Sequence, residues 1–211
     1  MSIKELKKKE KETKRNYIMD TAQKLFLSKD YDEVSMNSIA KEVGVNKATL
    51  YYYFKNKEAL YFAIVLRGVQ ILEKKIKKEV KKGKAGREKF LLHEKADSEF
   101  FSKNPDCMRL LYSPQLHKLD VDNISNSEEY QELVKILKGL MYTLIGSIKL
   151  GVDDGTIRKD VNPVEGAILV SLISQSMANM SGLYKDILEN EGISEQKFAL
   201  DLKSFIHNMF W

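Results

Sequence analysis

The stretch that decides the fold is residues 35–60, which have the sequence SMNSIAKEVGVNKATLYYYFKNKEAL. Ser35 is a favourable N-cap, because its hydroxyl can accept a hydrogen bond from a backbone N–H of the helix that follows. Apolar side chains then recur at helical spacing up to Gly44, where we expect the left-handed conformation that glycine adopts freely. Asn46 is a favourable N-cap for the next helix. The stretch therefore predicts two short helices joined by a tight turn, as in a helix-turn-helix.

The helix predicted at residues 47–54 has an inner and an outer side. Leu50 and Phe54 are four residues apart, so they share the inner face. The first residues of a recognition helix reach base edges in DNA. Ala48 would allow close approach, and Thr49 could donate a hydrogen bond or place its methyl group on a thymine methyl. Tyrosine hydroxyls and lysine suit phosphate oxygens. The outward residues are Lys47, Ala48, Thr49, Tyr51 and Tyr52.

A third helix is predicted to begin at Asn56, which is a favourable cap, with Lys57 in its first turn. Exposed N–H groups at a helix N-terminus can hold a phosphate, and Lys57 adds a full positive charge there. The alternative for the preceding run of three tyrosines is an aromatic patch that is partly core and partly surface, with Tyr53 partly buried. The conjunction of caps, spacing and aromatic residues favours DNA binding over this structural alternative.

Residues 39–60 follow the pattern Ile-Ala-x-x-x-Gly-Val-x-x-x-Thr-Leu-Tyr-x-Tyr-Phe-x-x-Lys-x-x-Leu. This pattern resembles the signature of TetR/AcrR-type transcriptional repressors, and the resemblance extends over about residues 15–62. The chain departs from the usual pattern at Asp30 and Ala48, where glycine is common, and at Asn37, where arginine is common. Asp tolerates left-handed geometry better than most residues. The resemblance implies phosphate and base contacts at Ser35, Asn37, Asn46, Lys47, Thr49, Tyr51, Tyr52 and Lys57.

Length and composition predict an all-α protein. A chain of 211 residues can bury a sizeable core. It has 3 prolines and 11 glycines, and apolar patterns at three- and four-residue spacing dominate it. We predict a helix-turn-helix DNA-binding domain with a basic N-terminal arm at residues 1–56, and a larger helical domain at residues 57–211. The resemblance assigns ligand binding and dimerisation to the larger domain.

The excess positive charge is confined to the segment that carries the motif. Residues 1–57 hold 13 Lys and Arg against 8 Asp and Glu, whereas the remaining residues hold 22 of each. This distribution predicts binding to a polyanion, weakened by salt. A basic arm before the first helix could touch a minor groove or the DNA backbone, although Glu5, Glu10 and Glu12 interrupt it. The alternative is a solvated, frayed helix start.

Other classes of function have little support. Cys107 is the only cysteine, so no intrachain disulfide can form, and the composition suits a reducing cytoplasm. We expect an inert thiol rather than a redox sensor. The N-terminus lacks a signal-peptide pattern, and no apolar run is long enough to span a membrane. The three histidines lie far apart and no catalytic motif is present, so no enzyme activity, metal or cofactor is expected.

The second half predicts a series of helices. The sequence favours helices from Lys57 to about Lys82, at about 87–103, around 106–111, from about 127 to 150, from Pro163 to about Asn190, and from Ser194 to the end. Residues 113–126 and 151–160 are expected to be loops or turns.

The last two predicted helices carry apolar stripes that could pack within the chain or against a second copy. In the family, the last two helices form the dimer interface, and the intrachain core competes for the same side chains. The candidate interface residues are Leu169, Ile173, Met177, Met180, Tyr184, Phe198, Leu202, Phe205 and Met209.

The resemblance also implies a small-molecule pocket in the larger domain. Phe, Tyr and Met side chains suit an apolar or aromatic ligand, although each could equally be an ordinary core residue. The candidates are Phe62, Leu66, Phe90, Phe100, Phe101, Met108, Tyr112, Met141, Tyr142 and Met177. His93 and His117 could hold a polar group of the ligand.

These observations together predict a ligand-responsive DNA-binding regulator, a repressor by default, that binds a palindromic operator as a homodimer. Two recognition helices on a two-fold axis would read half-sites about 34–36 Å apart, or multiples of that distance. A ligand that prefers another separation would release the dimer by a population shift, with the helix from Lys57 as the lever. The alternatives are a non-specific DNA-coating protein, and a helical ligand-binding protein or enzyme whose basic end is incidental.

Overall fold

The computed structural model describes residues 2–113 and 127–211, and all their regular structure is helical, as predicted. The loop predicted at 113–126, with His117, lies almost wholly outside these residues. The chain divides into two compact units: unit 1 (residues 2–70, 113 and 127–136) and unit 2 (residues 71–112 and 137–211). No helix among the residues described has both the length and the apolar character of a membrane span.

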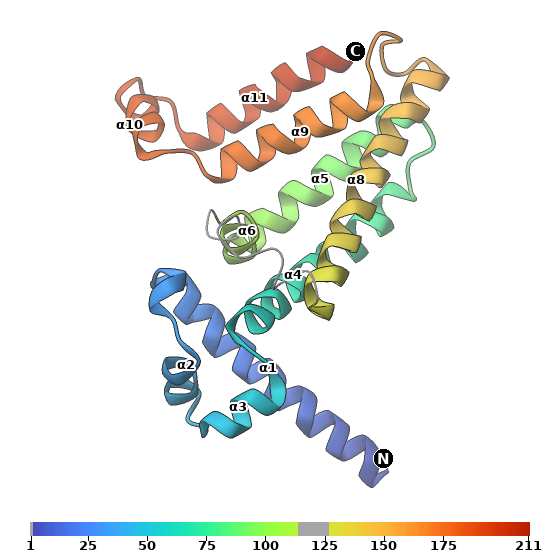
Figure 1. Cartoon of the computed structure of the whole chain (residues 1–211). Helices are drawn as coiled ribbons and strands as arrows, with labels where there is room; N and C mark the ends of the chain where they lie inside the picture. Colours follow the sequence, from blue (N-terminus) through green and yellow to red (C-terminus); the bar gives the residue numbers. More distant parts are fainter. Residues whose placement is uncertain (1, 114–126) are drawn as a thin grey trace. The chain divides into compact units, whose positions relative to one another are not determined.

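Unit 1 contains the predicted helix-turn-helix (Figure 1). Its aliphatic core includes Ile18, Ile39, Leu50 and Leu60, each fully buried. The elements are α1 (Ile3–Ser28), the 3-10 helix η1 (Tyr31–Glu33), α2 (Met36–Val43), α3 (Lys47–Tyr53), the first part of α4 (Lys57–Val80) and the start of α8 (Glu128–Asp154).

Two features of unit 1 differ from expectation. The basic residues at the N-terminus do not form an arm before the first helix but belong to α1, which a capping box of Ser2 and Glu5 begins. The N–H of Glu5 donates to the Ser2 hydroxyl, and the Glu5 carboxylate accepts from the Ser2 N–H. Asp30 has φ −63°, so it does not need the left-handed geometry that its glycine-like position suggested.

Unit 2 packs around one aromatic and aliphatic core. Phe90, Ile148 and Phe210 are almost completely buried and lie in the same cluster. Besides the later parts of α4 and α8, the unit consists of α5 (Gly86–Lys103), α6 (Pro105–Leu111), α9 (Pro163–Ala178), α10 (Gly182–Asn190) and α11 (Glu195–Phe210).

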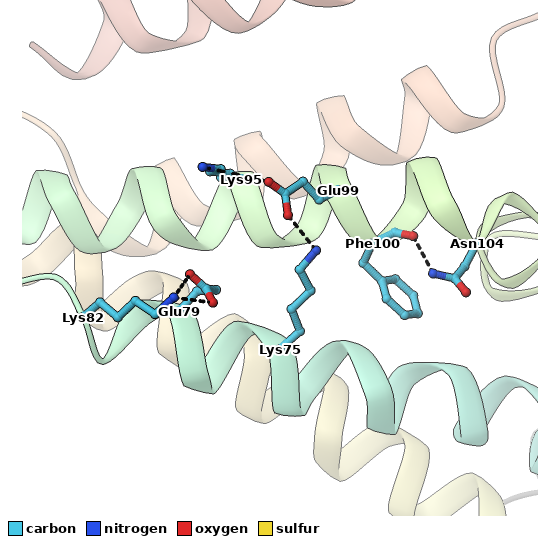
Figure 2. Close-up of polar contacts among 7 residues, drawn as sticks. All are labelled: Lys75, Glu79, Lys82, Lys95, Glu99, Phe100 and Asn104. Carbon is cyan, nitrogen blue, oxygen red and sulfur yellow. Dashed lines mark hydrogen bonds and ion pairs between the residues drawn. The ribbon is translucent and has the colours of Figure 1, made fainter.

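Polar contacts join α4 to α5 on the surface of unit 2. Figure 2 shows the Lys75 ammonium 3.0 Å from the Glu99 carboxylate across the two helices, with Lys95 on the other side of that carboxylate. Glu79 and Lys82 pair within α4, and the Asn104 amide caps α5 by donating to the Phe100 carbonyl. The charged pairs are exposed, so each contributes little to stability.

The beginning of α5 meets the end of α8 without side chains between them. A Cβ atom on Gly86 would lie 1.9 Å from the Gly151 nitrogen, so the two backbones approach as only glycine permits. The Gly86 N–H donates to the Asp154 carboxylate at 2.7 Å, and the Arg87 N–H donates to the Thr156 hydroxyl. The pKa of Asp154 is lowered first by the hydrogen bond that its carboxylate accepts from the Thr156 hydroxyl, and then by those that it accepts from the Gly86 and Thr156 N–H groups. Asp154 therefore caps α5 from a distant part of the chain.

The C-terminus closes the same core. The Phe210 carbonyl accepts a hydrogen bond from the Arg158 N–H at 2.9 Å. The Trp211 ring packs against the Arg87 guanidinium, whose carbon is 4.0 Å from the ring centroid, and against the His207 ring, whose centroid is 4.9 Å away. The His207 Nε2 contacts the Glu94 carboxylate at 2.6 Å, which ties α11 to α5.

The helix predicted at 163–190 is in fact two helices. Its period continues through residues 179–181, but Asn179 ends α9 and Ser181 stands before α10 in an extended conformation. The Asn179 amide lies 3.3 Å from both the Tyr112 and Gln175 carbonyls. Polar side chains of this kind compete with the helix for backbone hydrogen bonds. The helix predicted to end near residue 150 instead continues to Asp154.

Candidate nucleic-acid interface

The turn between α2 and α3 has the predicted geometry. Gly44 is left-handed, with φ 74° and ψ 35°. Its N–H donates to the Lys41 carbonyl, and the Val45 N–H donates to the Ala40 carbonyl at 3.0 Å. These two bonds form a Schellman motif, which satisfies carbonyls at the end of α2. Backbone hydrogen bonds therefore form the turn between α2 and α3, and the turn uses no side chain of α3.

The caps that begin these helices are also as predicted. The Ser35 hydroxyl accepts from the Ser38 N–H at 3.1 Å, and the side-chain Oδ1 of Asn46 accepts from the Thr49 N–H at 2.7 Å. Asn56 caps α4 in the same way, accepting from the Ala59 N–H. Since Asn46 uses its oxygen as a cap, only its amide N–H₂ group is left to donate to a phosphate.

The outer face of α3 is open. Leu50 and Phe54 are buried beneath it, whereas Tyr52 is 66 % exposed and Tyr51 is 43 % exposed. Of the other predicted contacts in α2, α3 and their caps, Thr49 is half-buried. Those that are exposed are Ser35, Asn37, Asn46, Lys47 and Ala48. Most of the predicted contact residues on α2, α3 and their caps are thus exposed.

Lys57 is engaged within unit 1. Its ammonium donates to the Tyr31 carbonyl at 2.8 Å and lies 3.9 Å from the centroid of the Tyr31 ring. The Tyr31 hydroxyl donates to Glu58 at 3.1 Å, and burial raises the pKa of that hydroxyl. A phosphate at Lys57 would therefore have to share the ammonium with these contacts.

Two cations of α1 lie against α3 and its end, although they were not among the predicted contacts. The Lys11 ammonium is 4.8 Å from the centroid of the Tyr52 ring, and the Arg15 guanidinium carbon is 4.8 Å from that of Phe54. Such distances allow cation–π attraction. Lys11 and Arg15 are four residues apart, a helical spacing that could have identified them. The interpretation of this segment as an arm left that spacing unused.

The predicted pocket residues are distributed over both units. Phe62 and Leu66 belong to unit 1, and the others to unit 2. Phe62, Phe90, Phe100 and Phe101 are buried, whereas Leu66, Met108, Tyr112, Met141 and Met177 are half-buried. Tyr142 is 70 % exposed, so its ring contacts solvent rather than a core.

The polar residues of unit 2 include a buried histidine. His93 is 8 % exposed, its ring is hydrogen-bonded to the Leu140 carbonyl, and its Nε2 has no partner among the described atoms. Burial lowers the pKa of His93 to about 4. One turn later on α5, burial and the neighbouring Glu94 raise the pKa of Asp97 to about 7.

The predicted interface stripe divides between core and surface. Ile173 and Leu202 pack partly on the core of unit 2. Tyr184, Phe205, Met209 and Leu169 are exposed, while Met177, Met180 and Phe198 are half-buried. Further apolar side chains of the same helices are exposed and were not predicted. They are Val164, Ile168, Leu172, Leu183, Ile187 and Leu200.

Comparison with known proteins matches the N-terminal region to a family of bacterial regulators. The sequence model of the family described as bacterial regulatory proteins, tetR family, matches residues 18–64. The fatty acid metabolism regulator protein of Bacillus subtilis is 28 % identical over 154 residues, which cover 73 % of this chain and 76 % of that protein.

Solved structures share the fold. The transcriptional regulator FadR from Bacillus subtilis, in complex with stearoyl-CoA, superposes with a TM-score of 0.67 at 18 % identity, covering 90 % of this chain and 96 % of that one. AibR, in complex with isovaleryl coenzyme A and operator DNA, gives a TM-score of 0.66 at 21 % identity, covering 80 % and 87 %.

Proposed function

Because the chain is a transcriptional regulator of the TetR family, we propose that it binds a palindromic operator as a homodimer and is released by an acyl-coenzyme A. The observation that carries the DNA-binding part is the open outer face of α3, positioned by the Schellman turn at Gly44. Lys47, Ala48 and Thr49 occupy the first turn, where a recognition helix meets base edges. Its place of action would be the cytoplasm, where the operator lies.

Selection of bound duplexes from a random DNA library, at near-physiological salt, tests the operator. An enriched palindrome is the expected result, and uniform weak recovery would instead support the non-specific binder, which contacts phosphates alone. Tyr51→Phe, on the face of α3, should weaken binding to the selected sequence. Tyr17→Phe, at a similarly exposed tyrosine of α1, is the matched control and should not.

Dimerisation is supported by the exposed apolar side chains of α9, α10 and α11. Leu172, Tyr184 and Phe205 are each at least half exposed, which is unusual for so many neighbouring apolar groups in a monomer. A charge at Phe205 should dissociate a dimer that buries this ring. Sedimentation of Phe205→Glu is therefore expected to show monomers, and Ser204→Glu, at an exposed residue on another face of α11, dimers. A wild-type monomer at micromolar concentration would refute the interface.

The effector class comes from the relatives. The 28 % identical relative is a fatty acid metabolism regulator, and two structures with this fold hold acyl thioesters of coenzyme A. Unit 2 offers apolar and aromatic side chains suited to an acyl chain. A ligand can release the protein from DNA only to the extent that it binds the DNA-free conformation more tightly than the DNA-bound one. The helix α4, which belongs to both units, is the proposed lever.

Titration of the operator complex with stearoyl-CoA and isovaleryl-CoA tests this proposal. We expect at least one thioester to release the DNA, while free coenzyme A, at the same concentration, leaves it bound. If neither thioester changes affinity or raises the melting temperature of the protein, the acyl-coenzyme A class is wrong, whereas the DNA-binding part of the proposal stands.

A further inference from the structure

Six cations of α1 lie on one face of the helix. Each lies three or four residues from another member of the set, which places all six within about a third of the helix circumference. The row runs in register with Ile18 and Ala22, the buried residues that continue the same face into the core of unit 1. We call it the basic stripe. Its members are Lys4, Lys7, Lys8, Lys11, Lys14 and Arg15.

The acidic residues and the remaining lysine of this segment lie off the stripe. Glu5, Glu10 and Glu12 flank it, and Lys9 is on the opposite side of the helix. The negative charges that interrupt the sequence therefore do not interrupt the row. All the stripe residues except Arg15 are exposed.

The stripe adjoins the outer face of α3. Lys11 and Arg15 reach the rings of Tyr52 and Phe54, each at 4.8 Å. Figure 1 shows α1 continuing past α3 towards its N-terminus. At 1.5 Å per residue the stripe is about 16 Å long. It thus continues from the contact between Lys11 and the exposed ring of Tyr52 on α3.

A row of like charges has an energetic cost that points to a partner. Lysines three and four residues apart repel one another by a few tenths of a kcal/mol per pair. The helix that carries them has little packing of its own here, since Ile3 is 75 % exposed and Leu6 is 43 % exposed. Phosphates along a DNA strand would convert this repulsion into attraction and release counterions.

We propose that the basic stripe of α1 binds the phosphate backbone of the same DNA duplex that α3 reads. This inference rests on the proposed DNA-binding function. The stripe would position the recognition helix and add affinity without reading sequence, because phosphate contacts carry no sequence information directly.

The test compares two triple variants with equal loss of charge. Lys4→Gln/Lys7→Gln/Lys8→Gln neutralises the exposed end of the stripe, and Lys9→Gln/Lys24→Gln/Lys29→Gln neutralises lysines of α1 and its C-cap that lie off the stripe. Glutamine has nearly the helix propensity of lysine, so both variants should keep the fold, which circular dichroism checks. Affinity for the selected operator is measured over a series of salt concentrations, with phosphate-ethylation interference at one salt concentration.

The stripe variant is expected to bind the operator at least tenfold more weakly than the control variant near physiological salt. The slope of log K against log[salt] should fall by about 0.9 for each phosphate contact that is lost. Sites of ethylation interference found with the wild type should disappear with the stripe variant, while the preferred sequence is unchanged. Equal slopes and equal interference for the two variants would overturn the proposal. Failure of the wild type to select any sequence would instead refute the DNA-binding function itself.

Discussion

Replacing His93 by asparagine should change how the stability of unit 2 depends on pH. The buried imidazole bonds to the Leu140 carbonyl, and burial lowers its pKa to about 4. In the unfolded chain its pKa is about 6.5. Between these values the unfolded state binds a proton that the folded state does not, so His93 makes the protein less stable as the pH falls from about 6.5 to about 4.

The size of this effect follows from the two pKa values. At about 1.36 kcal/mol per pKa unit, the difference between 6.5 and about 4 corresponds to on the order of 3 kcal/mol. Asp97 acts in the opposite direction, because burial and Glu94 raise its pKa to about 7. The folded state then keeps a proton that the unfolded state has lost. The stability that the protonated Asp97 contributes is therefore lost as the pH rises from about 4 to about 7. In the wild type the two slopes offset each other.

Urea unfolding followed by circular dichroism, at a series of pH values from 4 to 7.5, measures these slopes. His93→Asn can still donate to the Leu140 carbonyl but cannot titrate, so its stability should fall as the pH rises, since Asp97 acts alone. Asp97→Asn should show the reverse slope. Lys95→Gln, at an exposed residue of the same helix, is the control. If the curve for His93→Asn runs parallel to that of the wild type, the assignment of a depressed pKa to His93 is wrong.

Three further perturbations probe the fold. Gly86→Ala should destabilise the protein by about 3 kcal/mol or more in denaturant unfolding, because its methyl group would overlap the Gly151 backbone; a loss below about 1 kcal/mol would contradict this close approach. Gly44→Ala should lower the free energy of unfolding by roughly 1–2 kcal/mol, because alanine is strained in the left-handed conformation that Gly44 adopts. Operator binding should then weaken at temperatures near the unfolding midpoint. An unchanged midpoint would show that the turn relaxes. Tyr31→Phe removes the hydroxyl that donates to Glu58 and should cost about 1 kcal/mol, while leaving the contact between Lys57 and the aromatic ring; equal stability of the two proteins would show that the bond contributes nothing.

The helix-turn-helix could be predicted from the sequence because its determinants are local. The caps at Ser35, Asn46 and Asn56 each bond a backbone N–H three residues away, and Gly44 forms its own turn. The same local signals misled at residues 179–181, where an uninterrupted apolar period concealed the caps that separate α9 from α10.

Other features depend on contacts between distant residues. The pairing of Lys57 with the Tyr31 carbonyl joins residues 26 apart in sequence. The capping of α5 by Asp154 joins residues 68 apart in sequence. No sequence pattern near Gly86 predicts this contact. The sequence predicts two domains that meet at residues 56 and 57, and it gives no signal that α4 and α8 each contribute residues to both units.

The position of Trp211 gives the protein a built-in spectroscopic reporter. It is the only tryptophan in the chain, and it lies against Arg87, Phe90 and His207, all of which belong to unit 2. Its fluorescence will therefore follow the separation of α5 from α11 and will be insensitive to melting confined to the helix-turn-helix. Tyrosine emission reports on both units, because Tyr51 and Tyr52 lie in unit 1 and Tyr142 and Tyr184 lie in unit 2. Tryptophan fluorescence can thus show whether an effector or a DNA duplex changes the packing of unit 2.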